Sequence, residues 1–194
     1  MKITLFLASS SPRRRRILRG MGFSFRCLKP AYEERPLRGK GPASTVKAHA
    51  LAKALSAAPA VRRGVVLGSD TIVFHGGRVI GKPADLASAF RMLGRLQGRW
   101  HRVYTGVALL DVRNGRSVRR RVFCETTRVF LKKMSPEEMA RYFRRIGPLD
   151  KAGAYAIQSP RATIVREVRG SSQNAAGLPA ERLAPILRRF LAKI

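Results

Sequence analysis

The sequence predicts a mixed α/β fold, formed by one domain that spans residues 1–194. Short apolar runs typical of strands alternate along the chain with longer segments of helical apolar spacing. Clusters of glycine and other small residues separate these segments. Hydrophobic residues make up 45% of the chain, as in globular rather than disordered proteins. The length of 194 residues suits one domain, or one domain with two lobes.

The first elements have clear local signals. The chain begins with the apolar run Ile3–Ala8, and a strand is predicted over Lys2–Leu7. A helix is expected after it, because Ser11 is a good N-cap and Pro12 suits the first helical position. Gly20 is a natural end for this helix. The next elements are a short strand over Phe23–Leu28, a loop over Pro30–Pro42 and an alanine-rich helix over Ala43–Ala58.

Two glycine-containing turns organise the middle of the chain. Gly76-Gly77 predicts a hairpin between strands over Val65–Val73 and Arg78–Ile80. Asn114-Gly115 predicts a second hairpin, between longer strands over Trp100–Val112 and Ser117–Phe130. Helices are expected over Asp85–Leu96, Ser135–Arg145 and Ala180–Ala192, the last interrupted near Pro185, with short strands over Ala154–Ile157 and Thr163–Val168.

Three turns of small residues, each after a strand-like segment, supply hydroxyls, cations and one carboxylate. They are Ser9–Arg14, Gly68–Thr71 and Gly81–Pro83. Four consecutive arginines from Arg13 to Arg16 fall in the first helical turn, where cations oppose the helix dipole. A bound anion would explain them, although a solvated basic helix face is the alternative. The combination is what a metal–polyphosphate complex needs, so we expect an enzyme that acts on nucleotides.

The charge of the chain is extreme, with 40 Lys and Arg residues against 11 Asp and Glu residues and a net charge of +29. Such a chain attracts polyanions non-specifically, so a nucleic-acid-binding protein is the competing interpretation. The basic residues are spread along the chain, however, and no RNA-recognition or zinc-finger pattern is present. No apolar run is long enough for a membrane span. Cys27 and Cys124 have no metal-binding spacing, and we expect two buried thiols in a reducing cytoplasm.

Five segments together resemble the Maf family of nucleoside triphosphate pyrophosphatases. They occur in order between residues 5 and 179, as LASSSPRRRRIL, GSDTIVFHGGRVIGKP, LQGRWHRVYTGVALL, PLDKAGAYAIQ and GLP. The resemblance implies a two-lobed fold like that of inosine-triphosphate pyrophosphatases, with an elongated mixed sheet, flanking helices and a central cleft. It implies a homodimer that hydrolyses a nucleoside triphosphate to the monophosphate and pyrophosphate, with Mg²⁺ or Mn²⁺. Part of the family was first described as septum-formation inhibitors.

The resemblance also implies roles for individual residues. Asp70 matches the catalytic aspartate, as general base, metal ligand or both. Glu34 matches a second metal ligand, with Glu33 as the alternative one residue away. We expect a structural hydrogen bond at His101, and surface positions for His49 and His75. The residues expected to bind substrate phosphates are Ser9, Ser10, Arg14, Lys53 and Lys82.

Three further positions concern which nucleotide base the protein recognises. Arg13, Thr71 and Gln158 resemble the trio of family members that prefer dTTP and UTP, in a house-cleaning role for nucleotide pools. Members that act on 7-methyl-GTP tend to carry Trp, Gln and Glu at these positions. A Gln amide can accept a hydrogen bond from pyrimidine N3–H and donate one to a carbonyl oxygen, which agrees with the first group. Pyrophosphatases for 7-methyl-GTP or modified nucleotides remain the alternative.

Overall fold

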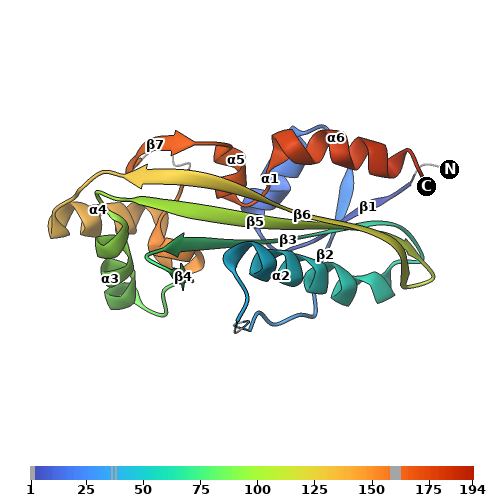
Figure 1. Ribbon diagram of the computed structural model, residues 1–194, viewed down its shortest axis with the longest axis horizontal. Coiled ribbons are helices and arrows are strands. Elements are labelled where there is room, and N and C mark those ends of the chain that lie inside the picture. The colour runs from blue at the N-terminus through green and yellow to red at the C-terminus, as the bar shows by residue number, and fades with distance from the viewer. Residues whose placement is uncertain (1–2, 36, 38, 158–162) are drawn as a thin grey trace. The chain divides into compact units, whose positions relative to one another are not determined.

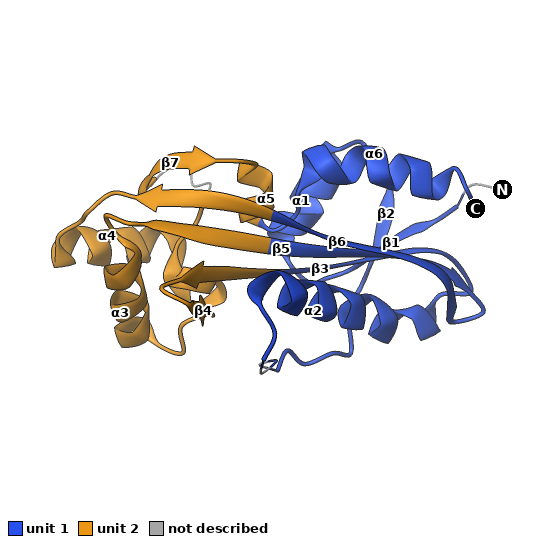
Figure 2. Ribbon diagram, viewed as in Figure 1, with its two compact units in different colours: residues 1–70, 105–125, 177–194 blue, residues 71–104, 126–176 orange. Residues whose placement is uncertain are grey.

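The computed structural model describes residues 3–35, 37, 39–157 and 163–194, which form two compact units (Figure 2). Unit 1 comprises residues 1–70, 105–125 and 177–194, and unit 2 comprises residues 71–104 and 126–176. The three longest strands run from one unit into the other. The predicted mixed α/β fold class is confirmed. The expectation of a single domain with a central cleft stays a prediction.

Strands and helices alternate through most of the chain (Figure 1). The strands are β1 (Leu5–Ala8), β2 (Phe25–Leu28), β3 (Arg63–His75), β4 (Arg78–Ile80), β5 (Trp100–Arg113), β6 (Arg116–Leu131) and β7 (Val165–Arg169). The α-helices are α1 (Pro12–Gly20), α2 (Pro42–Ala57), α3 (Leu86–Leu96), α4 (Pro136–Ile146), α5 (Ser172–Ala176) and α6 (Ala180–Leu191). Short 3₁₀ turns cover Ala58–Ala60, Pro148–Asp150 and Ala152–Ala154.

The strands form one mixed sheet in the order β2-β1-β3-β5-β6-β7, with β4 paired to β3. β1 pairs in parallel with both β2 and β3, and Ala8 lies opposite Gly68. β3–β4 and β6–β7 are antiparallel. Both predicted hairpin turns are present: Gly76 and Gly77 have φ angles of 56° and 76°, and Asn114 and Gly115 have φ angles of 49° and 76°. Such left-handed turn conformations favour glycine and asparagine.

The core of unit 1 has two sides because side chains alternate along its strands. On one side, apolar residues of β1, β3 and β5 pack against α1 and α6, including Leu18, Leu183 and Leu187. On the other side, smaller residues of the same strands pack against the alanine-rich face of α2. Figure 2 shows α6 and α2 on opposite sides of the strands within this unit. The alanines allow α2 to approach the sheet closely.

The core of unit 2 is built from β3, β5 and β6 with α3 and α4. Val103, Val129 and Leu131 of the strands belong to one buried cluster with Leu93 of α3 and Phe143 of α4. Both helices start where the sequence predicts, and a capping box begins each, at Asp85 for α3 and at Ser135 for α4.

Three predictions of local structure are wrong. Gly68–Thr71 is not a turn but lies inside β3. Residues Ala154–Ile157 form no strand, because Gly153 and Ala154 have φ angles of 71° and 58° and the chain turns there. Helix α6 is not interrupted at Pro185, which lies inside a continuous helix. Leu183, Leu187 and Phe190 bury the apolar face of α6 in the core, and this packing offsets the hydrogen bond that the proline removes.

Three burial expectations are also corrected. His49 is buried rather than on the surface, because α2 turns it toward the loop before the helix. Cys27 is exposed on β2, a strand at the edge of the sheet, and Cys124 is half-buried.

None of the helices in the described residues is long and apolar enough to cross a membrane.

Candidate functional site

The turn from β1 into α1 brings a serine and an arginine together. Ser9 is buried at the end of β1, and its Oγ accepts hydrogen bonds from the Ser11 N–H at 3.2 Å and from Arg14 Nη1 at 3.3 Å. Ser11 caps the helix as predicted, accepting from the Arg14 N–H at 3.5 Å. Ser10 is exposed in this turn, and Arg13 is half-buried. A hydroxyl, a guanidinium and the helix N-terminus therefore meet in one place.

Arg14 is anchored from a distant part of the chain. Its Nε donates to the carbonyl oxygen of Gly177 at 3.0 Å, and Ser69 Oγ donates to the same oxygen at 3.0 Å. Burial lowers the pKa of the Arg14 guanidinium, while the carboxylates of Asp70 and Glu34 act in the opposite direction. The guanidinium is thus held in place within the electric field of both acids.

The centre of the site is an ion cluster of one lysine and two carboxylates. Lys53 of α2 is buried, and its Nζ donates to Asp70 Oδ1 at 2.6 Å and also to Glu34 Oε1. Glu33 instead forms an exposed ion pair with Arg35 at 3.6 Å. The structure thereby selects Glu34 over Glu33 as the acid that joins the cluster.

Lys53 binds only one of the two carboxylate oxygens of Asp70. Asp70 is only 2% exposed, and its Oδ2 is buried without a hydrogen-bond partner in the described part of the chain. An unpaired buried carboxylate oxygen is costly, so such an atom is a candidate for contact with a ligand, a water or a metal ion.

The sheet and helix α2 bring these residues together. β1 and β3 are parallel, and the last residues that pair are Ala8 and Gly68. Ser9 comes directly after Ala8 and Asp70 two residues after Gly68, so both lie beyond the same end of the paired segment. A Cβ atom at Gly68 would lie 2.2 Å from the Ala50 carbonyl oxygen, so α2 packs directly on the backbone of β3. This close approach is what allows the Lys53 side chain to reach Asp70.

The carboxylates of Asp70 and Glu34 fit a divalent cation that arrives with phosphate oxygens. Within the described ranges, no group of three or more His, Cys, Asp and Glu side chains could hold a metal alone. Mg²⁺ commonly binds through one or two carboxylates together with substrate phosphates, and this donor set meets that need.

The sequence-based reasoning missed several polar groups of this site. They are the Ser69 hydroxyl, the Gly177 carbonyl and a hydrogen bond of 2.8 Å between Tyr32 Oη and His49 Nδ1. The spacing of His49 four residues before Lys53 was the available signal, since it places both side chains on one helix face.

The other predicted residues belong to unit 2 or lie outside the described residues. Thr71 is half-buried in β3, and Lys82 is exposed after β4. Gln158 lies outside the described residues. His101 makes the predicted structural hydrogen bond, with Nε2 2.7 Å from Tyr155 Oη in the core of unit 2.

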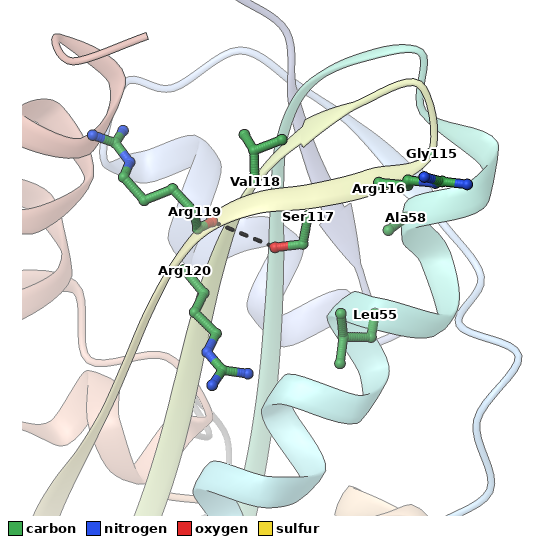
Figure 3. Close-up of a pocket in the computed structure, with 8 residues that line it drawn as sticks. All are labelled: Leu55, Ala58, Gly115, Arg116, Ser117, Val118, Arg119 and Arg120. Atoms are coloured by element: carbon green, nitrogen blue, oxygen red, sulfur yellow. Dashed lines mark hydrogen bonds between the residues drawn. The ribbon is translucent and has the colours of Figure 1, made fainter.

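A separate pocket of about 520 Å³ lies in unit 1, between the end of α2 and the β5–β6 hairpin (Figure 3). It shares no lining residue with the ion cluster, and none of its lining residues is acidic. Arg119 donates to the Phe190 carbonyl oxygen at 2.8 Å and lies over the Phe190 ring. The pocket is lined by Leu55, Ala58, Gly115, Arg116, Ser117, Val118, Arg119 and Arg120.

Comparisons with known proteins agree with the resemblance seen in the sequence. A model of the family described as Maf-like protein matches residues 4–190. The chain is 43% identical over 186 residues to a dTTP/UTP pyrophosphatase of Pelotomaculum thermopropionicum, covering 96% of each chain. It is 42% identical over 190 residues to a dTTP/UTP pyrophosphatase of Gloeobacter violaceus, covering 98% of this chain and 97% of the relative. The solved structure of the Staphylococcus aureus Ham1 protein has a similar fold, with a TM-score of 0.51, 14% identity and 98% of both chains covered.

Proposed function

The chain belongs to the Maf-like protein family, and from this membership we propose that it hydrolyses dTTP and UTP to the monophosphates and pyrophosphate. Two relatives named dTTP/UTP pyrophosphatase match nearly the whole chain at more than 40% identity. The structural observation that carries the proposal is the cluster of Asp70, Lys53 and Glu34, in the same unit as the Ser9–Arg14 turn. Carboxylates and phosphate-binding donors are the two kinds of group that this hydrolysis needs.

In the proposed reaction, a water oxygen forms a bond to the α-phosphorus. The bond from this phosphorus to the α–β bridging oxygen breaks, and pyrophosphate leaves. Asp70 Oδ2 is the atom available to accept the proton of the water, since Oδ1 is bonded to Lys53. Arg14 and Ser9 would hold phosphate oxygens, and Lys53 keeps the carboxylates of Asp70 and Glu34 side by side despite their like charge.

We propose Mg²⁺ or Mn²⁺ as the cofactor, with Asp70 and Glu34 as its protein ligands. Bound there with the substrate, such an ion would neutralise charge on the phosphate oxygens and lower the pKa of a coordinated water. Asp70 Oδ2 suits ligation of the ion as well as proton transfer, so the two uses of this carboxylate stay open.

Base selection is assigned, as a proposal, to Arg13, Thr71 and Gln158. The dTTP/UTP names of the relatives support this assignment. We propose Ser10 and Lys82 as further phosphate-binding residues, because both are exposed and follow strands. A homodimer and a house-cleaning role in the cytoplasm belong to the same proposal.

The test is pyrophosphate release from dTTP, UTP, CTP, GTP and 7-methyl-GTP with Mg²⁺ or Mn²⁺. We expect turnover of dTTP and UTP that falls by about 10²–10⁴-fold in Asp70→Asn, because the variant loses both the proton acceptor and a ligand charge. Circular dichroism of the variant would check that the fold survives.

Each other outcome contradicts a defined part of the proposal. Preference for GTP or 7-methyl-GTP would overturn the roles of Arg13, Thr71 and Gln158 but leave Asp70 in place. Unchanged activity in Asp70→Asn would overturn the site. Absence of metal-dependent turnover with every nucleotide would favour the polyanion-binding interpretation of the +29 charge.

A further inference from the structure

A tyrosine and a histidine form a second contact between the loop that carries Glu34 and helix α2. Tyr32 Oη lies 2.8 Å from His49 Nδ1, and their rings are 5.9 Å apart at an interplanar angle of 49°. His49 is buried, with 5% of its surface exposed. Neither residue has a part in the reaction proposed above.

The positions of the two residues in the chain relate them to the ion cluster. Tyr32 lies two residues before Glu34, and His49 lies four residues before Lys53 on the same face of α2. The Tyr32–His49 and Glu34–Lys53 hydrogen bonds therefore join the same loop to the same helix, one helical turn apart. Because Lys53 also binds Asp70, the place of the loop fixes where Glu34 stands relative to Asp70.

From this arrangement we propose that Tyr32 and His49 are a positioning pair that holds Glu34 beside Asp70. The inference rests on the proposed function, because it assigns Glu34 a task in that reaction. Glu34 itself is half exposed, at 49% of its side chain, so its own surroundings confine it less than they confine Asp70, at 3%. The contact of half-buried Tyr32 with buried His49 gives the loop a second attachment to α2, beside that of Glu34 to Lys53.

The electrostatic setting agrees with a bond donated by the tyrosine. Burial raises the pKa of Tyr32, and the negative charges of Asp70 and Glu34 raise it further. The phenol therefore keeps its proton at neutral pH and can donate to His49 Nδ1, which accepts when the ring proton is on Nε2.

The test compares Tyr32→Phe, His49→Leu and the double variant with His49→Asn, whose side-chain oxygen can replace Nδ1 as the acceptor. We expect kcat for dTTP with Mg²⁺ to fall about tenfold in both single variants, because small displacements of catalytic groups are costly. KM should change less than about twofold, the double variant should be no worse than the single ones, and His49→Asn should recover most of kcat.

A second measurement does not depend on activity. Hydrogen exchange of the backbone amides at residues 32–35 should become faster in Tyr32→Phe and His49→Leu, and return toward the wild-type rate in His49→Asn. Tyr142→Phe is the matched control for stability, because it removes the hydroxyl of a buried tyrosine in unit 2, which accepts a hydrogen bond of 2.9 Å from the Ala156 N–H. It should lower the melting temperature without changing exchange at residues 32–35.

The outcomes separate the pair from the proposed function. If both single variants keep the wild-type kcat and loop exchange while melting lower, as Tyr142→Phe does, the pair is only a packing contact and the inference is wrong. If the wild type turns over no nucleotide, the proposed function fails, and hydrogen exchange alone decides whether the pair holds the loop.

Discussion

Lys53 is the residue on which the geometry of the candidate site depends. It is buried and bonded to two carboxylates, one of them buried as well. Buried ion pairs contribute little net stability, because desolvation of the charges offsets their attraction. The main effect of Lys53 is therefore to hold Asp70 and Glu34 together, and its net contribution to the stability of unit 1 is small.

The buried histidine His101 leads to a prediction about how stability depends on pH. Burial lowers the pKa of His101 to about 4, and the nearby His75 lowers this pKa further. Between pH 6.5 and 4 the unfolded chain binds a proton at this histidine and the folded chain does not. Stability should therefore be lost as the pH falls through this range, by up to about 3 kcal/mol.

Urea unfolding of the wild type and His101→Phe at about pH 7 and about pH 4.5 would measure this effect. The variant should be less stable at neutral pH, because Tyr155 loses its partner, but it should show a shallower decline toward acid. Parallel declines in both proteins would show that His101 does not account for the acid sensitivity.

The contact of α2 with β3 determines where Lys53 lies relative to Asp70. Gly68 has no room for a side chain, because a Cβ atom would lie 2.2 Å from the Ala50 carbonyl oxygen and 2.9 Å from Ala54 Cβ. Gly106 of β5 has the same relation to Val46, with 2.2 Å to its carbonyl oxygen. Glycines on two neighbouring strands thus set the depth at which α2, and with it Lys53, lies on the sheet.

Gly68→Ala should therefore destabilise the protein by roughly 1–3 kcal/mol or more, since neither backbone can yield easily. It should also lower turnover of dTTP, because α2 must move away from Asp70. Gly94→Ala is the control: nothing lies within 4 Å of a Cβ atom there, inside α3, and alanine should stabilise that helix by about 1 kcal/mol. Thermal unfolding and activity should be measured for both variants. If the two variants behaved alike, the explanation from the close contact of α2 with β3 would be wrong.

For the whole molecule, the dominant physical property is its net charge of +29. Exposed arginines occur on several elements of both units, among them Arg116 and Arg120 at the pocket of Figure 3 and Arg91 and Arg95 on α3. A charge spread in this way favours attraction of polyanions without a dedicated binding surface.

We therefore expect salt-dependent binding of duplex DNA that weakens equally in Arg116→Gln/Arg120→Gln and in Arg91→Gln/Arg95→Gln, because each variant loses two positive charges. Fluorescence anisotropy at several salt concentrations would compare their affinities and salt slopes. A much larger loss for the hairpin variant alone would contradict this expectation and would make the pocket a specific anion site.

Elements with strong local signals were predicted correctly from the sequence. Ser11, Asp85 and Ser135 begin helices as predicted, and the Asn114-Gly115 turn joins the two longest strands. These features depend on neighbours within a few residues, and the sequence displays such neighbours directly. The resemblance to a family also predicted site roles for Asp70, Lys53, Glu34 and Arg14, which stay predictions.

The contacts among these residues, by contrast, depend on how distant parts of the chain pack. Lys53 binds Glu34 and Asp70, which are 19 and 17 residues away, and Arg14 binds the carbonyl of Gly177 at a separation of 163 residues. The burial of His49 likewise depends on its partner Tyr32, 17 residues earlier. Such contacts arise from the packing of helices on a sheet. Local sequence patterns cannot predict this packing, because each pattern extends over only one or two turns of the chain.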